Sequence, residues 1–480
     1  MGYAEYLLSL KDKQFEMSYC QFKQKYSNYL NFESVPQIQQ FNNTIEYGET
    51  IRINMSKSMD ITSKIYLYCN LPELNEITFP FFDKQYPLYV RYKKNIGYTL
   101  LKKCSIYFDN TMIQTFNDVF LNILPYIRPD KNIDYLIGNT KENLNFTTFK
   151  KQNTLYIPLP FYFEENESSL PIKSLNAIVS VELKFSKFDD LYEIGPTHFI
   201  KVNQKSCDFK QFDILIQNNI EIGIFFYFDS ELNFLFYNLI GEIDFDKSVN
   251  LSQYTLEEIY FKFQHQLITD KDNSDYMMII TEDNETETNI IDHVPYFDVR
   301  FLEASLLSKS VYITNTEKEK IAINKQYYLI PYNYVFIFHE YSFIKSTFMI
   351  PVKEPIIEIF WGYYDHKKKD FLDCIEQSTL SLDKNYTIFE NHSKYLTKNL
   401  IYFENDNVHN SKYIKTSNIH RYSFANNLDM KYQCTGVYNL PSDLIFELTS
   451  NLASTEGYFF FVVQCYKRLC VDDHSNFEFV

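Results

Sequence analysis

The sequence predicts an all-β protein built from antiparallel sandwiches or jelly rolls, and three observations support this. Aromatic residues make up 18% of the 480-residue chain, whereas Gly occurs only 10 times and Trp once. Enrichment in aromatic and β-branched residues favours sheet. Short apolar runs, several of them alternating with polar residues, recur in both halves of the chain. The connections between these runs are long, which is typical of jelly rolls.

The expected strands fall into two groups, separated from one another by Pro or polar residues. In the first half they are residues 45–54, 63–71, 103–108, 154–163 and 177–185. In the second half they are residues 326–338, 356–361, 444–449 and 458–466. The chain is too long for one ordinary core, so two or three domains are expected.

Helices are expected to be a minority, with 10–30 and 255–266 as the better candidates. A shorter helix is predicted at 317–324, because Thr316 followed three residues later by Glu319 fits a capping box. That helix would lie between a strand ending in Val-Tyr-Ile and a strand beginning at Tyr327.

The middle of the chain, residues 201–298, interrupts the rhythm of the two halves. It has aromatic-rich strand candidates at 220–240 and an acidic, polar stretch at 270–290. We interpret it as an insertion with a small packed part and exposed loops. The acidic stretch does not have the spacing of an EF-hand loop, so a solvated loop is favoured over a calcium site.

Charge argues against direct binding of nucleic acid. The chain has 46 basic and 62 acidic residues, a net charge of -16, whereas duplex binding requires clustered Lys and Arg. The run 366–369 (His-Lys-Lys-Lys) is the best basic candidate, and a solvated loop is its simpler interpretation. The apolar runs 220–228 and 458–463 are shorter than the ~20 residues that span a bilayer. We therefore expect a soluble protein in a reducing compartment.

The eight cysteines include no Cys-x-x-Cys pair and are expected to be reduced and mostly buried. Cys465 and Cys470 are the nearest pair, but a zinc site there would need two further ligands and only His474 is close. The pair His339-Glu340 starts like a zinc-protease helix, yet position 343 is Phe.

The remaining search for chemistry is also negative. Phosphate-binding glycine loops, dinucleotide fingerprints and nucleophile elbows do not occur in the sequence. Adjacent carboxylates are expected at the surface of a chain with 62 acids, so spacing singles out no acid/base pair. We therefore expect no catalytic, cofactor-binding or metal site, and no enzyme.

Several segments, in order, resemble the major capsid proteins of nucleocytoplasmic large DNA viruses, the double jelly-roll family. In the first half they are 43–71 (NTIEYGETIRINMSKSMDITSKIYLYCNL), 96–123 (IGYTLLKKCSIYFDNTMIQTFNDVFLNI) and 155–163 (LYIPLPFYF) with 170–190. In the second half they are 301–330 (FLEASLLSKSVYITNTEKEKIAINKQYYLI), 350–361 (IPVKEPIIEIFW), 420–428 (HRYSFANNL), 434–449 and 458–470 (YFFFVVQCYKRLC).

The resemblance implies two tandem eight-stranded antiparallel jelly rolls with short helices and a large insertion. The expected division is an N-terminal arm at 1–24, a first roll at 25–200, the insertion at 201–298 and a second roll at 299–480. The chain departs from the family at the helical turn, where it has Lys318, Lys320 and Ile321 in place of the family's usual Arg and Phe. It also has Tyr162 where the family often has Trp, and no Gly in its last ten residues.

The function implied is that of a structural virion protein. Three chains with two rolls each would form a pseudo-hexagonal homotrimeric capsomer of an icosahedral shell. The expected partners are the chain itself, neighbouring capsomers, minor capsid and penton proteins, and an internal viral membrane beneath the shell, with no direct contact to nucleic acid. The expected location is the virion capsid, with assembly in the host cytoplasm or a viral factory.

Two alternatives stay open at this point. One is a double jelly-roll scaffold or minor capsid protein of a large DNA virus. The other is a carbohydrate-binding β-sandwich, for which abundant aromatics are suitable. Because those aromatics lie within apolar strands such as 224–228 and 458–461, a core role is favoured over a glycan site.

Overall fold

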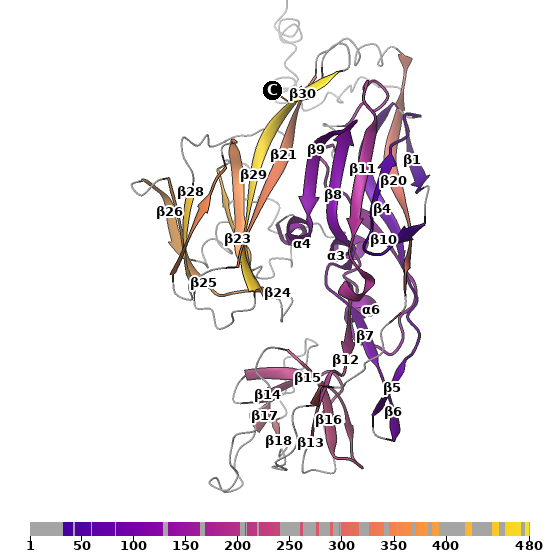
Figure 1. The fold of residues 1–480 in the computed structure, drawn as a ribbon, viewed down its shortest axis with the longest axis vertical. Coiled ribbons are helices and arrows are strands. Elements are labelled where there is room, and N and C mark those ends of the chain that lie inside the picture. Colours follow the sequence, from indigo (N-terminus) through magenta and orange to yellow (C-terminus); the bar gives the residue numbers. More distant parts are fainter. Residues whose placement is uncertain are drawn as a thin grey trace, which may run out of the picture.

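The structure is a computed structural model, drawn in Figure 1. It describes residues 32–479 apart from 42–43, 59, 82, 128–132, 164–168, 202–206, 208, 218–219, 241–259, 263–274, 278–288, 291–296, 298, 316–325, 340–344, 353, 366–369, 383–385, 393–417, 425–443, 451–456 and 472–475. Strands dominate this part of the chain, as the composition predicts.

The first jelly roll consists of two facing sheets (Figure 1, indigo to magenta, except β20, which is salmon-orange). One sheet has the order β1-β20-β4-β10, with strands β1 (Phe32–Gln40), β20 (Phe301–Ile313), β4 (Ile61–Leu71) and β10 (Asn153–Pro158). The other has the order β3-β11-β8-β9, with strands β3 (Thr50–Asn54), β11 (Val179–Phe185), β8 (Leu101–Phe108) and β9 (Thr111–Asn117).

The second jelly roll lies beside the first (Figure 1, orange to yellow). Its first sheet contains β21 (Gln326–Phe338), β29 (Gly457–Val471), β23 (Ile356–Asp365) and β27 (His420–Ser423), with β24 (Asp370–Leu372) and β30 (Phe477–Phe479) added at its margins. Its second sheet has the order β22-β28-β25-β26, with strands β22 (Lys345–Ile350), β28 (Leu444–Ser450), β25 (Ile375–Leu382) and β26 (Tyr386–His392).

The two rolls share one topology. The eight principal strands of each roll can be numbered in chain order. In both rolls, one sheet then has the strand order 1-8-3-6 and the other has the order 2-7-4-5. Even the irregularities correspond, since β8–β9 shifts register after Ile106 and β25–β26 shifts after Leu380. The expectation of a double jelly roll is therefore confirmed.

Most expected strands lie where their periodicity places them. The strand expected at 45–54 is divided, because Gly48 adopts a positive φ of 89° that an extended strand cannot contain. The result is β2 (Ile45–Glu46), which pairs with β20, followed by β3 in the opposite sheet.

The segment 301–330 joins the two rolls and does not begin the second one. Strand β20 pairs with β4 and β1 and so completes the first roll, whereas β21 opens the second. We expected the second roll to begin at residue 299. Strand pairing instead assigns residues 301–313 to the first roll. Nonlocal pairing buries Leu302 and Leu306 in the first core, and no local pattern specifies such a partner. The helix expected at 317–324 lies outside the described residues.

The middle segment contributes a sheet of its own, with the order β18-β17-β14-β15-β16-β13-β19. Its strands are β13 (His198–Lys201), β14 (Ile214–Gln217), β15 (Ile220–Asp229), β16 (Phe234–Leu239), β17 (Tyr260–Lys262), β18 (Asp275–Met277) and β19 (Asn289–Ile290). The helix expected at 255–266 is wrong at β17, because backbone pairing with β14 and β18 overrides helix propensity there. The rest of that range and the helix expected at 10–30 lie outside the described residues.

Helices are few and short in the described residues. They are α3 (Ile96–Thr99), α4 (Asp118–Ile127), α5 (Ile133–Leu136), α6 (Lys141–Leu144) and the 3₁₀ turn η2 (Phe188–Asp190). Helix α4 starts after Asn117, whose side-chain oxygen accepts a hydrogen bond from the Phe120 N–H at 3.0 Å. Its buried face includes Phe120 and Leu124, which anchor it over the end of the first roll.

Two small strand pairs extend the first roll towards the middle sheet (Figure 1). They are the hairpin of β5 (Thr78–Phe81) and β6 (Lys84–Pro87), and the pair of β7 (Tyr89–Tyr92) and β12 (Tyr192–Gly195). Strand β13 follows β12 after only two residues, so the chain passes directly from this extension into the middle sheet.

Candidate assembly surfaces

Of the side chains that resembled parts of chemical sites, the structure describes only some. Cys465 and Cys470 are buried and free, and burial raises the pKa of the Cys465 thiol to about 12. His474, Glu340 and the basic run 366–369 lie outside the described residues. Among the residues that are described, no group of three His, Cys, Asp or Glu could hold a metal ion.

The contact between the two rolls is an extension of the hydrophobic core. Along β29, Phe459 and Phe461 point into the second roll's own core, whereas Phe460 and Val462 belong to the cluster that fills the first roll. Strand β23 is correspondingly buried along both faces. The sheet of the second roll thus has two apolar faces, and one of them packs on its neighbour.

A buried amide connects the rolls at the centre of this contact. Gln114 on β9 is fully buried, and its Nε2 donates a hydrogen bond of 2.7 Å to the Pro331 carbonyl on β21. Its Oε1 accepts from the Tyr162 N–H at 2.9 Å. Both ends of one side chain are therefore satisfied by backbone groups, which fixes the position of β21 against the first roll.

Aromatic pairs flank the amide. The Tyr126 ring meets that of Phe371 at 5.8 Å, and the Phe108 ring meets that of Phe477 at 5.2 Å, both nearly perpendicular. Edge-to-face rings at these distances are favourable beyond the area they bury. Each pair takes one ring from each roll, so both pairs contribute to the contact between the rolls.

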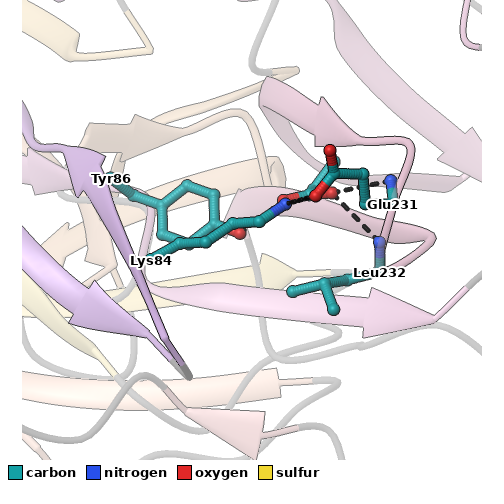
Figure 2. Close-up of polar contacts among 5 residues, drawn as sticks. Lys84, Tyr86, Glu231 and Leu232 are labelled. Atoms are coloured by element: carbon teal, nitrogen blue, oxygen red, sulfur yellow. Dashed lines mark hydrogen bonds and ion pairs between the residues drawn. The ribbon is translucent and has the colours of Figure 1, made fainter.

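The middle sheet is attached to the first roll by a polar cluster that Figure 2 shows. Asp229, at the end of β15, accepts a hydrogen bond of 2.9 Å from Lys84 Nζ and one of 2.5 Å from the Tyr86 hydroxyl. Its other oxygen accepts the backbone N–H groups of Glu231 and Leu232 at 2.8 and 3.0 Å. Lys84 also pairs with Glu231 at 2.6 Å.

We term this polar cluster the Asp229 clamp (Lys84, Tyr86, Asp229 and Glu231). Its hydrogen bonds shift the pKa of the Asp229 carboxyl. Burial alone would raise the pKa of Asp229, but the hydrogen bonds from Lys84 and Tyr86 outweigh burial and hold that pKa well below its ordinary value. The Asp229 carboxylate is therefore charged and fully bonded at any pH near neutrality.

Apolar packing accompanies the clamp. The Tyr86 ring stacks on Tyr227 at 5.5 Å with an angle of 5° between their planes. A mixed cluster of buried residues from the hairpin side and the middle sheet continues the contact, namely Phe79, Tyr86, Leu88, Phe199, Phe234 and Phe236. The middle segment therefore has its own packed cluster and a second one shared with the first roll. In Figure 1 it lies at one end of that roll and not within it.

These features define a class of protein: two jelly rolls packed side by side, with an inserted sheet at one end of the first roll.

Comparison with known proteins supports this class. Residues 20–213 match the family model described as "Major capsid protein N-terminus". "Probable capsid protein 4" of Acanthamoeba polyphaga mimivirus is 29% identical over 329 residues, which cover 64% of this chain and 61% of that protein. The "Major capsid protein" of Trichoplusia ni ascovirus 2c is 25% identical over 172 residues, 33% of this chain and 36% of that protein.

Solved structures show the same fold. PBCV-1 VP54 superposes with a TM-score of 0.60 at 11% identity, covering 96% of this chain and 99% of that one. The Faustovirus major capsid protein superposes with a TM-score of 0.61 at 9% identity, covering 97% and 96%. The chain spans less than two thirds of the length of the two sequence relatives. The resemblance to the major capsid proteins of large DNA viruses is confirmed, and the chain has the same double jelly-roll fold.

Sequence reasoning identified none of the residues that hold these surfaces together. Gln114 and Asp229 are unremarkable in the sequence, since their partners are 217 and up to 145 residues away. One signal was available: the run 356–361 is apolar at every position except Glu358 and does not alternate, which is typical of a strand covered on both faces.

Proposed function

We propose that this chain is a major capsid protein that forms homotrimeric, pseudo-hexagonal capsomers of an icosahedral virion shell. The observation that carries the proposal is the repeated topology, in which two rolls with the same strand order lie side by side in one chain. Three such chains around a threefold axis present six similar modules, and a tile of that outline fills a flat lattice.

Assembly of this kind needs burial of surface and no bond chemistry. A head-to-tail contact forms a closed ring when the rotation between neighbouring chains is an integer fraction of a full turn. In a ring of three chains, the same interface then occurs three times. The stiff sheets supply rigid walls, while the connections at the roll ends vary without disturbing the core. The buried amide and the ring pairs between the rolls suit this role because they hold the two modules of a chain at a fixed angle.

The proposal includes partners and location. Neighbouring capsomers, minor capsid proteins and penton proteins would complete the shell, and an internal membrane would lie beneath it, in the virion. The net charge of -16 argues against a lining that binds the genome directly. Among the described residues, no helix has both the length and the apolar composition to cross a bilayer.

The middle sheet would decorate the outer surface of the shell or reinforce contacts within the trimer. Its attachment at one end of the first roll, by the Asp229 clamp and a shared aromatic cluster, supports a protruding position. Its packing also ties it to that roll as a firm extension.

Electron microscopy of the purified protein tests the proposal. Discrete trimers with a hexagonal outline are expected, joining into larger arrays only with partner proteins. Flat honeycomb sheets on lipid would instead indicate a scaffold with the same fold. Burial of aromatics such as Phe226, Phe459 and Phe461 in cores favours the capsid proposal over the carbohydrate-binding alternative.

A further inference from the structure

A row of polar side chains lies within the contact between the two rolls. We term it the polar row, and it runs across one sheet of the second roll. It consists of Asn333 on β21, Gln464 on β29, Glu358 on β23 and Ser423 on β27, each paired with the next in the strand register. The exposed fractions of these residues are between 4 and 9%. Polar side chains buried to this degree normally have hydrogen-bond partners.

The polar row faces the first roll. Residues two apart on a strand point to the same face of the sheet. Two positions along the same strands are Val462 and Phe360, which belong to the cluster that fills the first roll, and Val335, which packs against it. On the other side of the row, the Pro331 carbonyl of β21 accepts the hydrogen bond from Gln114. Contacts with the first roll therefore flank the polar row on both sides.

An ion pair orders the β23 end of the row. Arg421 on β27 is also buried, and its Nε and Nη2 donate to Glu358 Oε2 at 3.0 and 2.7 Å. The guanidinium lies over the Phe360 ring, 5.5 Å from its centroid. Both hydrogen bonds go to one oxygen of the carboxylate. Glu358 Oε1 can therefore accept a further hydrogen bond on the side of Gln464.

The β21 end of the row is an amide whose partner is not among the described residues. Asn333 is 8% exposed, and both its Nδ2 and its Oδ1 are buried. Neither atom forms a hydrogen bond with any residue that the structure describes. Leaving a buried donor and a buried acceptor unsatisfied costs the full desolvation of both groups, so Asn333 requires a ligand.

The chemistry of the two atoms of Asn333 defines this ligand. Nδ2 donates and Oδ1 accepts, so a ligand that satisfies both must accept one hydrogen bond and donate another. A cation would satisfy only the oxygen, and an anion only the nitrogen. Water does both, and buried water typically makes about three hydrogen bonds to polar groups. Gln464 is the nearest further amide, since residues directly opposite in an antiparallel pair have Cβ atoms about 5 Å apart.

We propose that the contact between the two rolls contains a binding site for ordered water at the polar row. Water bound there bridges the Asn333 amide to the Gln464 side chain, and Gln464 continues the row towards Glu358 Oε1. The first roll can then pack over a polar stripe without leaving the Asn333 amide unsatisfied. The site lies within a single chain, so it goes beyond the proposed function and does not depend on trimer formation.

A crystal structure or electron-microscopy map of the full-length protein, at a resolution that shows ordered water, tests the proposal directly. A separate peak is expected at about 2.7–3.2 Å from Asn333 Oδ1 or Nδ2 and at a similar distance from a second polar atom of the row. A map with no peak beside Asn333 would overturn the proposal. So would density continuous with the polypeptide, because the amide would then have a protein partner.

A second measurement uses Asn333→Leu, which replaces the amide with an apolar side chain of similar size. If water bridges the row, this variant loses the bridge and leaves Gln464 without its partner, so the denaturant midpoint of unfolding should fall. If the amide is dry, removal of an unsatisfied polar group should raise the midpoint. Asn54→Leu is the matched control, since Asn54 is an exposed residue of β3 and should change the midpoint little. A midpoint of Asn333→Leu equal to or above that of the wild type would overturn the proposal.

Discussion

The Gln114 side chain and the Pro331 carbonyl are joined by a hydrogen bond of 2.7 Å that crosses from one jelly roll to the other. Gln114 is fully buried, and its side chain also accepts a hydrogen bond from the Tyr162 N–H. Water therefore cannot take the place of either partner of the amide. The angle between the rolls, on which any ring of chains depends, is therefore fixed in part by one residue.

Replacing Gln114 with Leu should destabilise the protein by about 3 kcal/mol, because two buried backbone groups lose their partners. Thermal or denaturant unfolding measures this loss. Gln85→Leu on β6 is the control, since Gln85 is exposed and should change stability little. Equal stability of the two variants would contradict the role given to Gln114.

The Asp229 clamp should control how firmly the middle sheet is held. Asp229→Asn keeps an oxygen for the backbone N–H groups, but its amide nitrogen then accepts from neither Lys84 nor Tyr86. Amide hydrogen exchange in β15 and β16 should accelerate several-fold, with the second roll unaffected. Asp83→Asn, an exposed carboxylate in the same hairpin, is the control. Unchanged exchange in the Asp229 variant would show that apolar packing alone holds the sheet.

The clamp also predicts an acid limit. Because the pKa of Asp229 in the folded protein is below its ordinary value of 3.8, its stabilising contribution is complete above that value and is lost as the pH falls further. Hydrogen exchange of β15 and β16 should thus be constant from neutral pH down to about 4 once corrected for the intrinsic rate. Loosening of this sheet already near pH 6 would be inconsistent with the clamp.

His420 gives the second roll a different pH dependence. It is fully buried with its ring stacked 5.6 Å from Trp361, and burial lowers its pKa to about 4 from 6.5. The unfolded chain therefore binds a proton below pH 6.5 that the folded chain does not, and stability falls as the pH drops from 6.5 to 4. The slope should be about 1.4 kcal/mol per pH unit.

Denaturant unfolding across this pH range measures the slope, and His420→Gln should reduce it because Gln does not titrate. Glu390→Gln on β26 is the comparison, as an exposed carboxylate of the same roll. A His420→Gln variant with the pH profile of the wild type would assign the acid sensitivity to other groups.

The cysteines should differ in reactivity. Burial raises the pKa of the Cys69 and Cys465 thiols to about 12, so both are protonated and shielded at neutral pH. Cys207 is more accessible than the other cysteines of the described residues. Among the cysteines of the described residues, a thiol reagent should modify Cys207 first, as peptide mass spectrometry can show, and it should reach Cys69 and Cys465 only on unfolding. Fast modification of Cys465 in the native protein would contradict the packing of β29.

Much of the fold could be predicted because strand periodicity is local. The run ending in Leu71 alternates, and β4 has that alternation as one buried and one half-exposed face. What could not be predicted was pairing between distant segments: β20 returns to the first roll, and β17 takes the place of an expected helix. The assembly residues were hidden for the same reason. Gln114 in the sequence is one more polar residue, and only the fold brings it to the Pro331 carbonyl of the other roll.

The mass of the purified protein in solution tests the central claim most directly. Size-exclusion chromatography with light scattering should give a stable species of three chains, because two equivalent rolls per chain require three copies to complete six modules. A monomer at every concentration, or an assembly whose number of chains is not a multiple of three, would contradict the account.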